Sequence, residues 1–127
     1  MTYLATSIND SPTIVEKASA LLADVRGKAL MFADGKVALA TAGAAAIGIG
    51  IMTNDENIAA GADVDIQIKD IGVVRAGAEI TKGAELASDA SGNLVAAKEG
   101  DYVVAIALED AKAAGVFVKA RLVNYKL

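Results

Sequence analysis

The chain has 127 residues, the length of a single domain, and 12 basic against 16 acidic side chains leave it with a net charge of −4. Cysteine, histidine and tryptophan are absent, which excludes disulfides, thiolate metal sites and Cys–His nucleophiles, along with the one side chain that ordinarily titrates near neutral pH. The acidic balance leaves no basic stripe for phosphates, so we expect no nucleic-acid partner, no cofactor, no metal and no catalytic site.

The first 24 residues form an N-terminal region for which the sequence leaves two structures open. Pro12 followed by Thr13 and Glu16 has the spacing of a helix start with a capping box. The apolar residues that would share one face of this short helix are Ile14, Ala18, Leu21 and Leu22.

The alternative is an extended arm over residues 1–12. Tyr3, Leu4 and Ile8 are apolar residues in an otherwise polar leader, and such a leader either docks on a neighbouring molecule or frays. The leader has no basic or apolar stretch typical of a signal peptide.

Residues 25–70 are predicted to form a first β unit. Asp34-Gly35 lies between two apolar runs and indicates a hairpin with a type I′ turn, where both central residues need positive φ. Val64, Ile66 and Ile68 alternate with polar residues, as in a half-buried antiparallel strand.

Residues 37–54 carry no charge and are long enough to span a membrane. They are mostly Ala, Gly and Thr, however, and Gly48 and Gly50 alternate with isoleucines at the period of a strand. We therefore expect no membrane segment, and we interpret the two glycines as places where backbones pack closely.

Residues 71–127 are predicted to form a second β unit. A strand region over 73–80 breaks at Gly77, and residues 89–93 form a turn equivalent to Asp34-Gly35. Further along, Val116, Val118, Ala120 and Leu122 alternate with Lys119 and Arg121 as in another half-buried strand.

The two units repeat one pattern at an offset of about 56 residues. Gly27 aligns with Gly83, residues 47–51 with 104–108, and residues 61–64 with 115–118. The predicted fold is therefore mainly β, a compact β-barrel or sandwich built from two repeated β units in one domain, with the N-terminal arm or short helix in front.

Three polar features are interpreted without chemistry. The pairs Asp63/Asp65 and Glu109/Asp110 have no neighbour in the sequence that would raise a carboxyl pKa for general-acid work. Residues 54–57 are rich in oxygen ligands but lack the spacing of a calcium loop, and they predict a solvated turn.

Lys112 suggests an alternative function. The segment Glu109-Asp110-Ala111-Lys112-Ala113 resembles the hairpin of lipoyl or biotinyl carrier domains, which attach a cofactor to a turn lysine and are also duplicated β units. In that family the lysine follows an acidic residue directly and lies between the two halves, whereas Ala111 intervenes here and Lys112 lies late in the second unit. A non-enzymatic β-barrel binding module is the broader form of this alternative.

A resemblance to a known family covers residues 20–122. The residues that carry it are GKAL at 27–30, ADGKV at 33–37, IGI at 47–49, AAG at 59–61, GAEITKG at 77–83, SDASG at 88–92, GDYVVAIALEDA at 100–111 and AG at 114–115. In this order they are similar to the capsid cement (decoration) proteins of tailed bacteriophages, although Ala105 stands where that family usually has glycine.

The resemblance implies a structural virion protein rather than an enzyme. It would be made in the host cytoplasm and bind the outer face of the phage head, commonly as a homotrimer that reinforces contacts between major capsid proteins. Threefold closure would bury apolar residues that lie near the polar termini of one chain. The interface residues expected on this basis are Tyr3, Leu4, Ile8, Tyr125 and Leu127.

Overall fold

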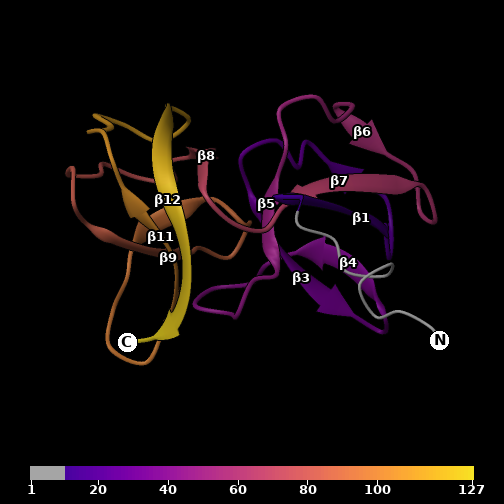
Figure 1. The fold of residues 1–127 in the computed structure, drawn as a ribbon, viewed down its shortest axis with the longest axis horizontal. Coiled ribbons are helices and arrows are strands. Elements are labelled where there is room, and N and C mark those ends of the chain that lie inside the picture. Colours follow the sequence, from indigo (N-terminus) through magenta and orange to yellow (C-terminus); the bar gives the residue numbers. More distant parts are fainter. Residues whose placement is uncertain (1–10) are drawn as a thin grey trace, which may run out of the picture.

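The computed structural model describes residues 11–127, which form strands and loops without a helix. Two five-stranded antiparallel sheets lie side by side along the long axis of the molecule (Figure 1). In spatial order the first sheet contains β1 (Thr13–Lys17), β7 (Asp63–Gln67), β5 (Gly48–Gly50), β3 (Ala29–Ala33) and β4 (Lys36–Leu39). The second contains β8 (Ile71–Arg75), β12 (Phe117–Lys126), β11 (Tyr102–Ala107), β9 (Glu85–Ser88) and β10 (Leu94–Ala96). A small ladder joins β2 (Leu22–Ala23) to β6 (Asn57–Ile58).

The two sheets have the same order of corresponding strands, so β1, β7, β5, β3 and β4 match β8, β12, β11, β9 and β10. Each sheet also curls toward closure in the same way. Ala18, just after β1, bridges Val37 of β4, and Ala76, just after β8, bridges Leu94 of β10. The mainly β fold of two repeated units is thereby confirmed.

The predicted hairpin joins β3 to β4, and its turn is of the expected type. Asp34 and Gly35 have φ angles of 52° and 77°, the positive values that a type I′ turn needs at both central positions. In the second unit the loop between β9 and β10 contains Gly92, whose φ is also positive at 85°.

The helix alternative for the N-terminal region is wrong within the described residues. Thr13–Lys17 is strand β1, which pairs along its length with β7. The capping-box spacing is a local preference, and pairing with an otherwise unpartnered strand outweighs it. Residues 1–10, with Tyr3, Leu4 and Ile8, lie outside the described residues.

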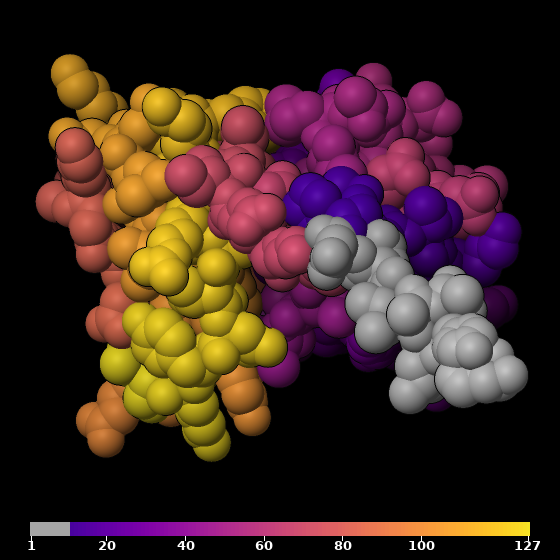
Figure 2. All heavy atoms as spheres, viewed as in Figure 1, coloured from indigo at the N-terminus to yellow at the C-terminus, as the bar shows by residue number. Residues whose placement is uncertain are grey.

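The hydrophobic core joins the two units into one body. One cluster lies within the first unit and includes Leu30, Val64 and Ile66, whereas the other combines Ala29 and Ile49 of the first unit with residues of the second. In the space-filling view the two units meet along a continuous seam (Figure 2). Residues 68–70 link β7 to β8, and β1, within the expected N-terminal region 1–24, is a strand of the first sheet. The division of the chain at residues 24 and 70 stays a prediction.

Gly48 and Gly50 of β5 owe their identity to close backbone packing. A Cβ atom on Gly48 would overlap the carbonyl of Gln67, and one on Gly50 would overlap the carbonyl of Val25. These contacts confirm the interpretation of the two glycines as packing residues. Residues 11–127 contain no helix that is long and apolar enough to cross a membrane.

Candidate functional site

Two of the acidic side chains singled out in the sequence, Glu109 and Asp110, accept hydrogen bonds from backbone N–H groups. Glu109 accepts a hydrogen bond from the backbone N–H of Lys119, and Asp110 accepts one from the backbone N–H of Lys82. Asp63 forms an exposed ion pair with Lys17 across the β1–β7 ladder. Within residues 11–127 there is also no group of three or more acidic side chains placed to hold a metal ion.

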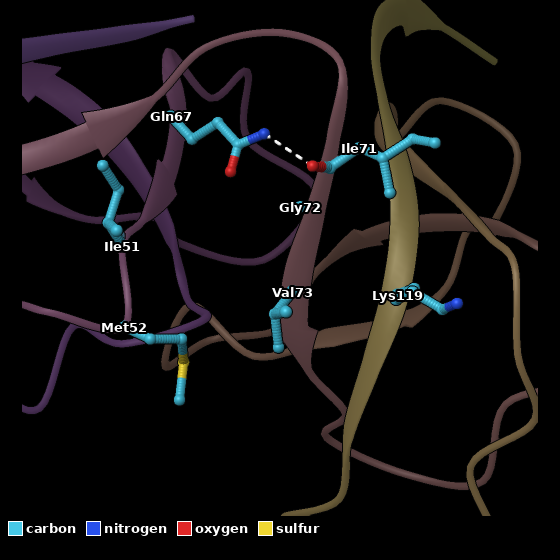
Figure 3. Close-up of a pocket in the computed structure, with 8 residues that line it drawn as sticks. Ile51, Met52, Gln67, Ile71, Gly72, Val73 and Lys119 are labelled. Atoms are coloured by element: carbon cyan, nitrogen blue, oxygen red, sulfur yellow. Dashed lines mark hydrogen bonds between the residues drawn. The ribbon is translucent and has the colours of Figure 1, made fainter.

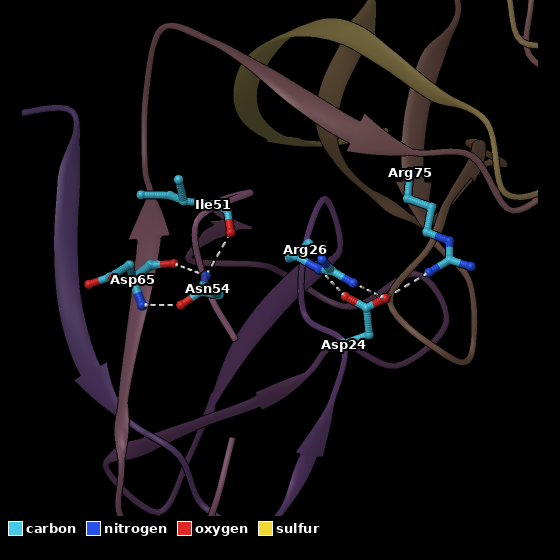
Figure 4. A network of polar contacts seen from close by, with 6 residues as sticks. All are labelled: Asp24, Arg26, Ile51, Asn54, Asp65 and Arg75. Carbon is cyan, nitrogen blue, oxygen red and sulfur yellow. Dashed lines mark hydrogen bonds and ion pairs between the residues drawn. The ribbon is translucent and has the colours of Figure 1, made fainter. Parts of the chain in front are cut away.

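Asn54 is a structural residue that the sequence interpretation missed. Its side chain is only 8% exposed, so the prediction of a solvated turn is wrong at this residue, although residues 55–57 are exposed. Its Nδ2 donates to the carbonyls of Ile51 and Asp65 at 2.9 and 2.8 Å, and its Oδ1 accepts from the Asp65 N–H at 2.9 Å (Figure 4). The only signal in the sequence was the general tendency of asparagine to bond backbone groups in turns.

A charged junction ties the first unit to the second. Arg26 binds the Asp24 carboxylate with two hydrogen bonds of 2.7 and 3.1 Å, and Arg75 of β8 approaches the same carboxylate at 3.4 Å (Figure 4). The hydrogen bond from Arg26 is the main reason that the pKa of Asp24 lies below its ordinary value. The Arg75 guanidinium also lies 5.8 Å from the centre of the Phe117 ring, a cation–π contact.

An apolar groove lies between the two units. It has a volume of about 280 Å³ and is lined by Gly50, Ile51, Met52, Gln67, Ile71, Gly72, Val73 and Lys119 (Figure 3). Ile71, Met52 and Val73 are 59%, 42% and 37% exposed along it. Gln67 spans the turn at one end, where its Nε2 donates to the carbonyls of Lys69 and Ile71. With lysine as the only ionisable lining residue, this groove is suited to apolar contact.

The C-terminal strand holds the two described members of the expected interface on the surface. Tyr125 and Leu127 are 40% and 42% exposed. The Tyr125 hydroxyl donates a hydrogen bond to Glu85, which raises the pKa of the tyrosine. The Leu127 N–H donates to the carbonyl of Asp101, so the chain end is fixed against the loop before β11.

Lys112 lies exposed in the loop between β11 and β12. The neighbouring Ala111 exchanges two backbone hydrogen bonds with Ile80, 2.8 and 2.9 Å long. The loop is therefore attached to the body of the second unit directly beside the lysine.

Comparison with known proteins identifies the family. The family model described as phage cement protein matches residues 13–122, from the first residue of β1 almost to the end of β12. The chain belongs to the phage cement proteins. It is therefore placed among the structural proteins of phage capsids, as the resemblance over residues 20–122 implied. No curated protein matches this cement protein.

Among the solved structures that share the fold of the cement protein is a phage head protein. It is the head fiber gp8.5 N base of bacteriophage phi29, with a TM-score of 0.67 and 19% sequence identity. The match covers 91% of this chain and 96% of that one. At this identity the likeness establishes a common fold.

Proposed function

We propose that this cement protein binds the outer face of a phage head as a homotrimer and stabilises contacts between major capsid proteins. It works by adhesion and turns over no substrate. The observation that carries the proposal is the match to the phage cement family over residues 13–122. The proposed location is the outer surface of the virion.

The described surface supports adhesion in two places. One is the rim of the apolar groove, where Met52, Ile71 and Val73 are exposed, and the other is the C-terminal pair Tyr125 and Leu127. Each patch is small, but a trimer that engages several capsid subunits multiplies weak contacts through effective concentration. We propose that the groove rim contacts the major capsid protein and that Tyr125 and Leu127, with Tyr3, Leu4 and Ile8, contribute to subunit contacts.

Binding to expanded heads that lack their own cement protein tests this function. The purified chain is expected to saturate such heads at a fixed ratio to the major capsid protein and to raise the temperature at which they break open. Sedimentation of heads mixed with increasing amounts of the purified protein measures the ratio, and a thermal scan of the loaded heads measures the stabilisation. Heads that gain neither bound protein nor heat resistance would refute the proposal.

The groove is tested by Ile71→Lys, which places a charge on the exposed rim. We expect binding to heads to weaken by about tenfold, equivalent to 1.4 kcal/mol, while the chain stays folded. Lys112→Ala is the matched control at an exposed position outside the groove. Equal binding by both variants would remove the groove from the contact surface.

An unmodified mass at Lys112 in a lipoylation-competent host would remove the carrier alternative.

A further inference from the structure

We propose that neighbouring copies in the trimer join head to tail, by the same contact that joins the two units within one chain. The Lys17 end of β1 in one copy docks on the Gly83 turn of the next copy. This inference rests on the self-association proposed above and names the surfaces that carry it.

The contact within the chain, called here the unit junction, is built on two backbone hydrogen bonds. The Arg75 N–H donates to the Gly27 carbonyl at 2.8 Å, and the Ala29 N–H donates to the Gly92 carbonyl at 2.7 Å. Gly27 is buried beneath Phe117, because a Cβ atom at this glycine would lie 2.9 Å from the Phe117 ring. The unit junction therefore places the end of β8 and the β9–β10 turn on the segment that leads into β3.

The duplicated fold supplies a counterpart for each part of the unit junction. Lys17 pairs with Asp63 at the end of the β1–β7 ladder, as Arg75 pairs with Phe117 in the β8–β12 ladder. Gly83 occupies the place of Gly27: Gly27 donates its N–H to the carbonyl of Gly50 at the end of β5, and Gly83 donates to that of Ala107 at the end of β11.

These counterparts are unoccupied surfaces within the described chain. Gly83 and Gly35, the counterparts of Gly27 and Gly92, are exposed, and a Cβ atom at either would meet nothing within 4 Å. The N–H of Ala18 donates to the carbonyl of Ala62, the residue just before β7, so the N–H of Lys17 points away from β7. Val15, on the same strand face as Lys17, is 56% exposed.

The charges on the two surfaces are complementary. At the Lys17 end of β1, the side chains of Lys17 and Asp63 are 60% and 61% exposed. Lys82 and Asp110 flank the Gly83 turn, where the Lys82 N–H donates to the Asp110 carboxylate at 2.7 Å. Phe117 covers Gly27 in the unit junction, so the counterpart contact places Asp63, at the ladder position of Phe117, beside the Gly83 turn that Lys82 and Asp110 flank.

The two surfaces lie at opposite ends of the molecule, which is the geometry of a head-to-tail assembly. In Figure 1 β1 runs away from the second unit, and the segment leading into β9 lies at the other end of the long axis. A contact between two different surfaces forms a ring when its rotation closes. A closed ring of three chains would hold six similar contacts, three of them unit junctions and three between copies.

Cross-linking tests the contact directly, because the chain has no cysteine of its own. The double variant Lys17→Cys/Lys82→Cys, treated with a short bismaleimide, is expected to give covalent trimers on a denaturing gel. Each single variant and the mismatched pair Lys17→Cys/Lys98→Cys, with Lys98 exposed elsewhere on the second unit, are expected to stay monomeric. The reaction is run on the free protein and on loaded heads.

A second variant measures the same contact without cross-linking. Val15→Lys places a charge on the exposed surface of β1 and is expected to raise the dissociation constant of the trimer by about tenfold. Ile71→Lys changes an equally exposed apolar residue, at 59%, in the groove and outside the two proposed surfaces, and should leave the constant unchanged. The head-to-tail contact alone is overturned if the wild-type chain forms trimers, the Lys17→Cys/Lys82→Cys variant does not cross-link, and Val15→Lys does not weaken the trimer. A wild-type chain that stays monomeric in solution and on heads would overturn the proposed self-association with it.

Discussion

The two β units share their strand order and differ mainly where they meet. At one ladder position the first unit has the exposed ion pair Lys17–Asp63, and the second has Arg75 over Phe117. The glycine that follows is exposed at Gly83 in the second unit and buried at Gly27 in the first, under that same phenylalanine.

The two units of this duplicated fold have kept the same turns and strand alternation, while their surfaces have diverged. Positive φ recurs at Gly27 and Gly83 and at Gly61 and Gly115, since each unit needs the same turns. The side chains beside those turns are free to change, and in the second unit they have become the apolar and cationic groups of the unit junction.

The largest expected difference in stability between the two units lies at the end of β5. Gly50→Ala would push a Cβ atom into the Val25 carbonyl and is expected to destabilise the fold by about 3 kcal/mol. The second unit has Ala107 at the corresponding place, fully inside the core, and Ala107→Gly should cost only about 1 kcal/mol. Denaturant unfolding of both variants measures the difference. Similar losses at the two positions would show that the units pack alike here.

The next effect concerns the loop between β5 and β7, which is longer than its counterpart between β11 and β12 and includes β6. Asn54→Ala removes three hydrogen bonds from a buried side chain and is expected to cost about 2 kcal/mol. Thr53→Ala, at an exposed neighbouring residue, is the control. Amide exchange should become faster in residues 51–65 before it does in the second unit. A uniform loss of protection over both units would contradict a local stabilising role for Asn54.

The matched ladder positions sharpen the comparison further. Phe117→Ala removes the ring that covers Gly27 and faces Arg75, and it is expected to cost about 1.5 kcal/mol. Asp63→Ala removes an exposed ion pair at the corresponding place and should change the free energy of unfolding by less than about 0.5 kcal/mol. Thermal unfolding of the two variants checks the order, and a reversed order would mean that Phe117 contributes little to the unit junction.

The smallest effect is the pH dependence of the unit junction. Arg26 holds the pKa of Asp24 below its ordinary value of 3.8, so the carboxylate contributes stability above that pH and loses it as the pH falls further. Because the group is partly solvated, we expect Asp24→Asn to cost about 0.5–1 kcal/mol at neutral pH. Unfolding measured from about pH 6 down to pH 2 should show wild type and variant converging below pH 3.8. A difference that stays constant over this range would refute the charge-based contribution.

Much of the fold could be predicted from local patterns. Asp34-Gly35 specified its turn through the need for two positive φ angles, and the buried Val64 and Ile66 were visible as alternation. Strand β1 was not predictable with the same certainty, because Pro12, Thr13 and Glu16 also satisfy a helix start and only pairing with β7 decides between the two. The candidate surfaces were less predictable: the role of Tyr125 and Leu127 as interface residues stays a prediction, and the groove was not foreseen.

The groove and the unit junction join residues far apart in the chain, such as Met52 with Val73 and Asp24 with Arg75. By itself the sequence determined the absence of thiol and imidazole chemistry, the turn positions, the strand period and the repeat, because each of these depends on residue type or on neighbours a few positions away. Only the tertiary structure decided the strand at Thr13–Lys17, the burial of Asn54 and which of two equivalent glycines is covered. Those outcomes depend on which distant surfaces pack together, and the free energy of that packing is a property of the whole molecule.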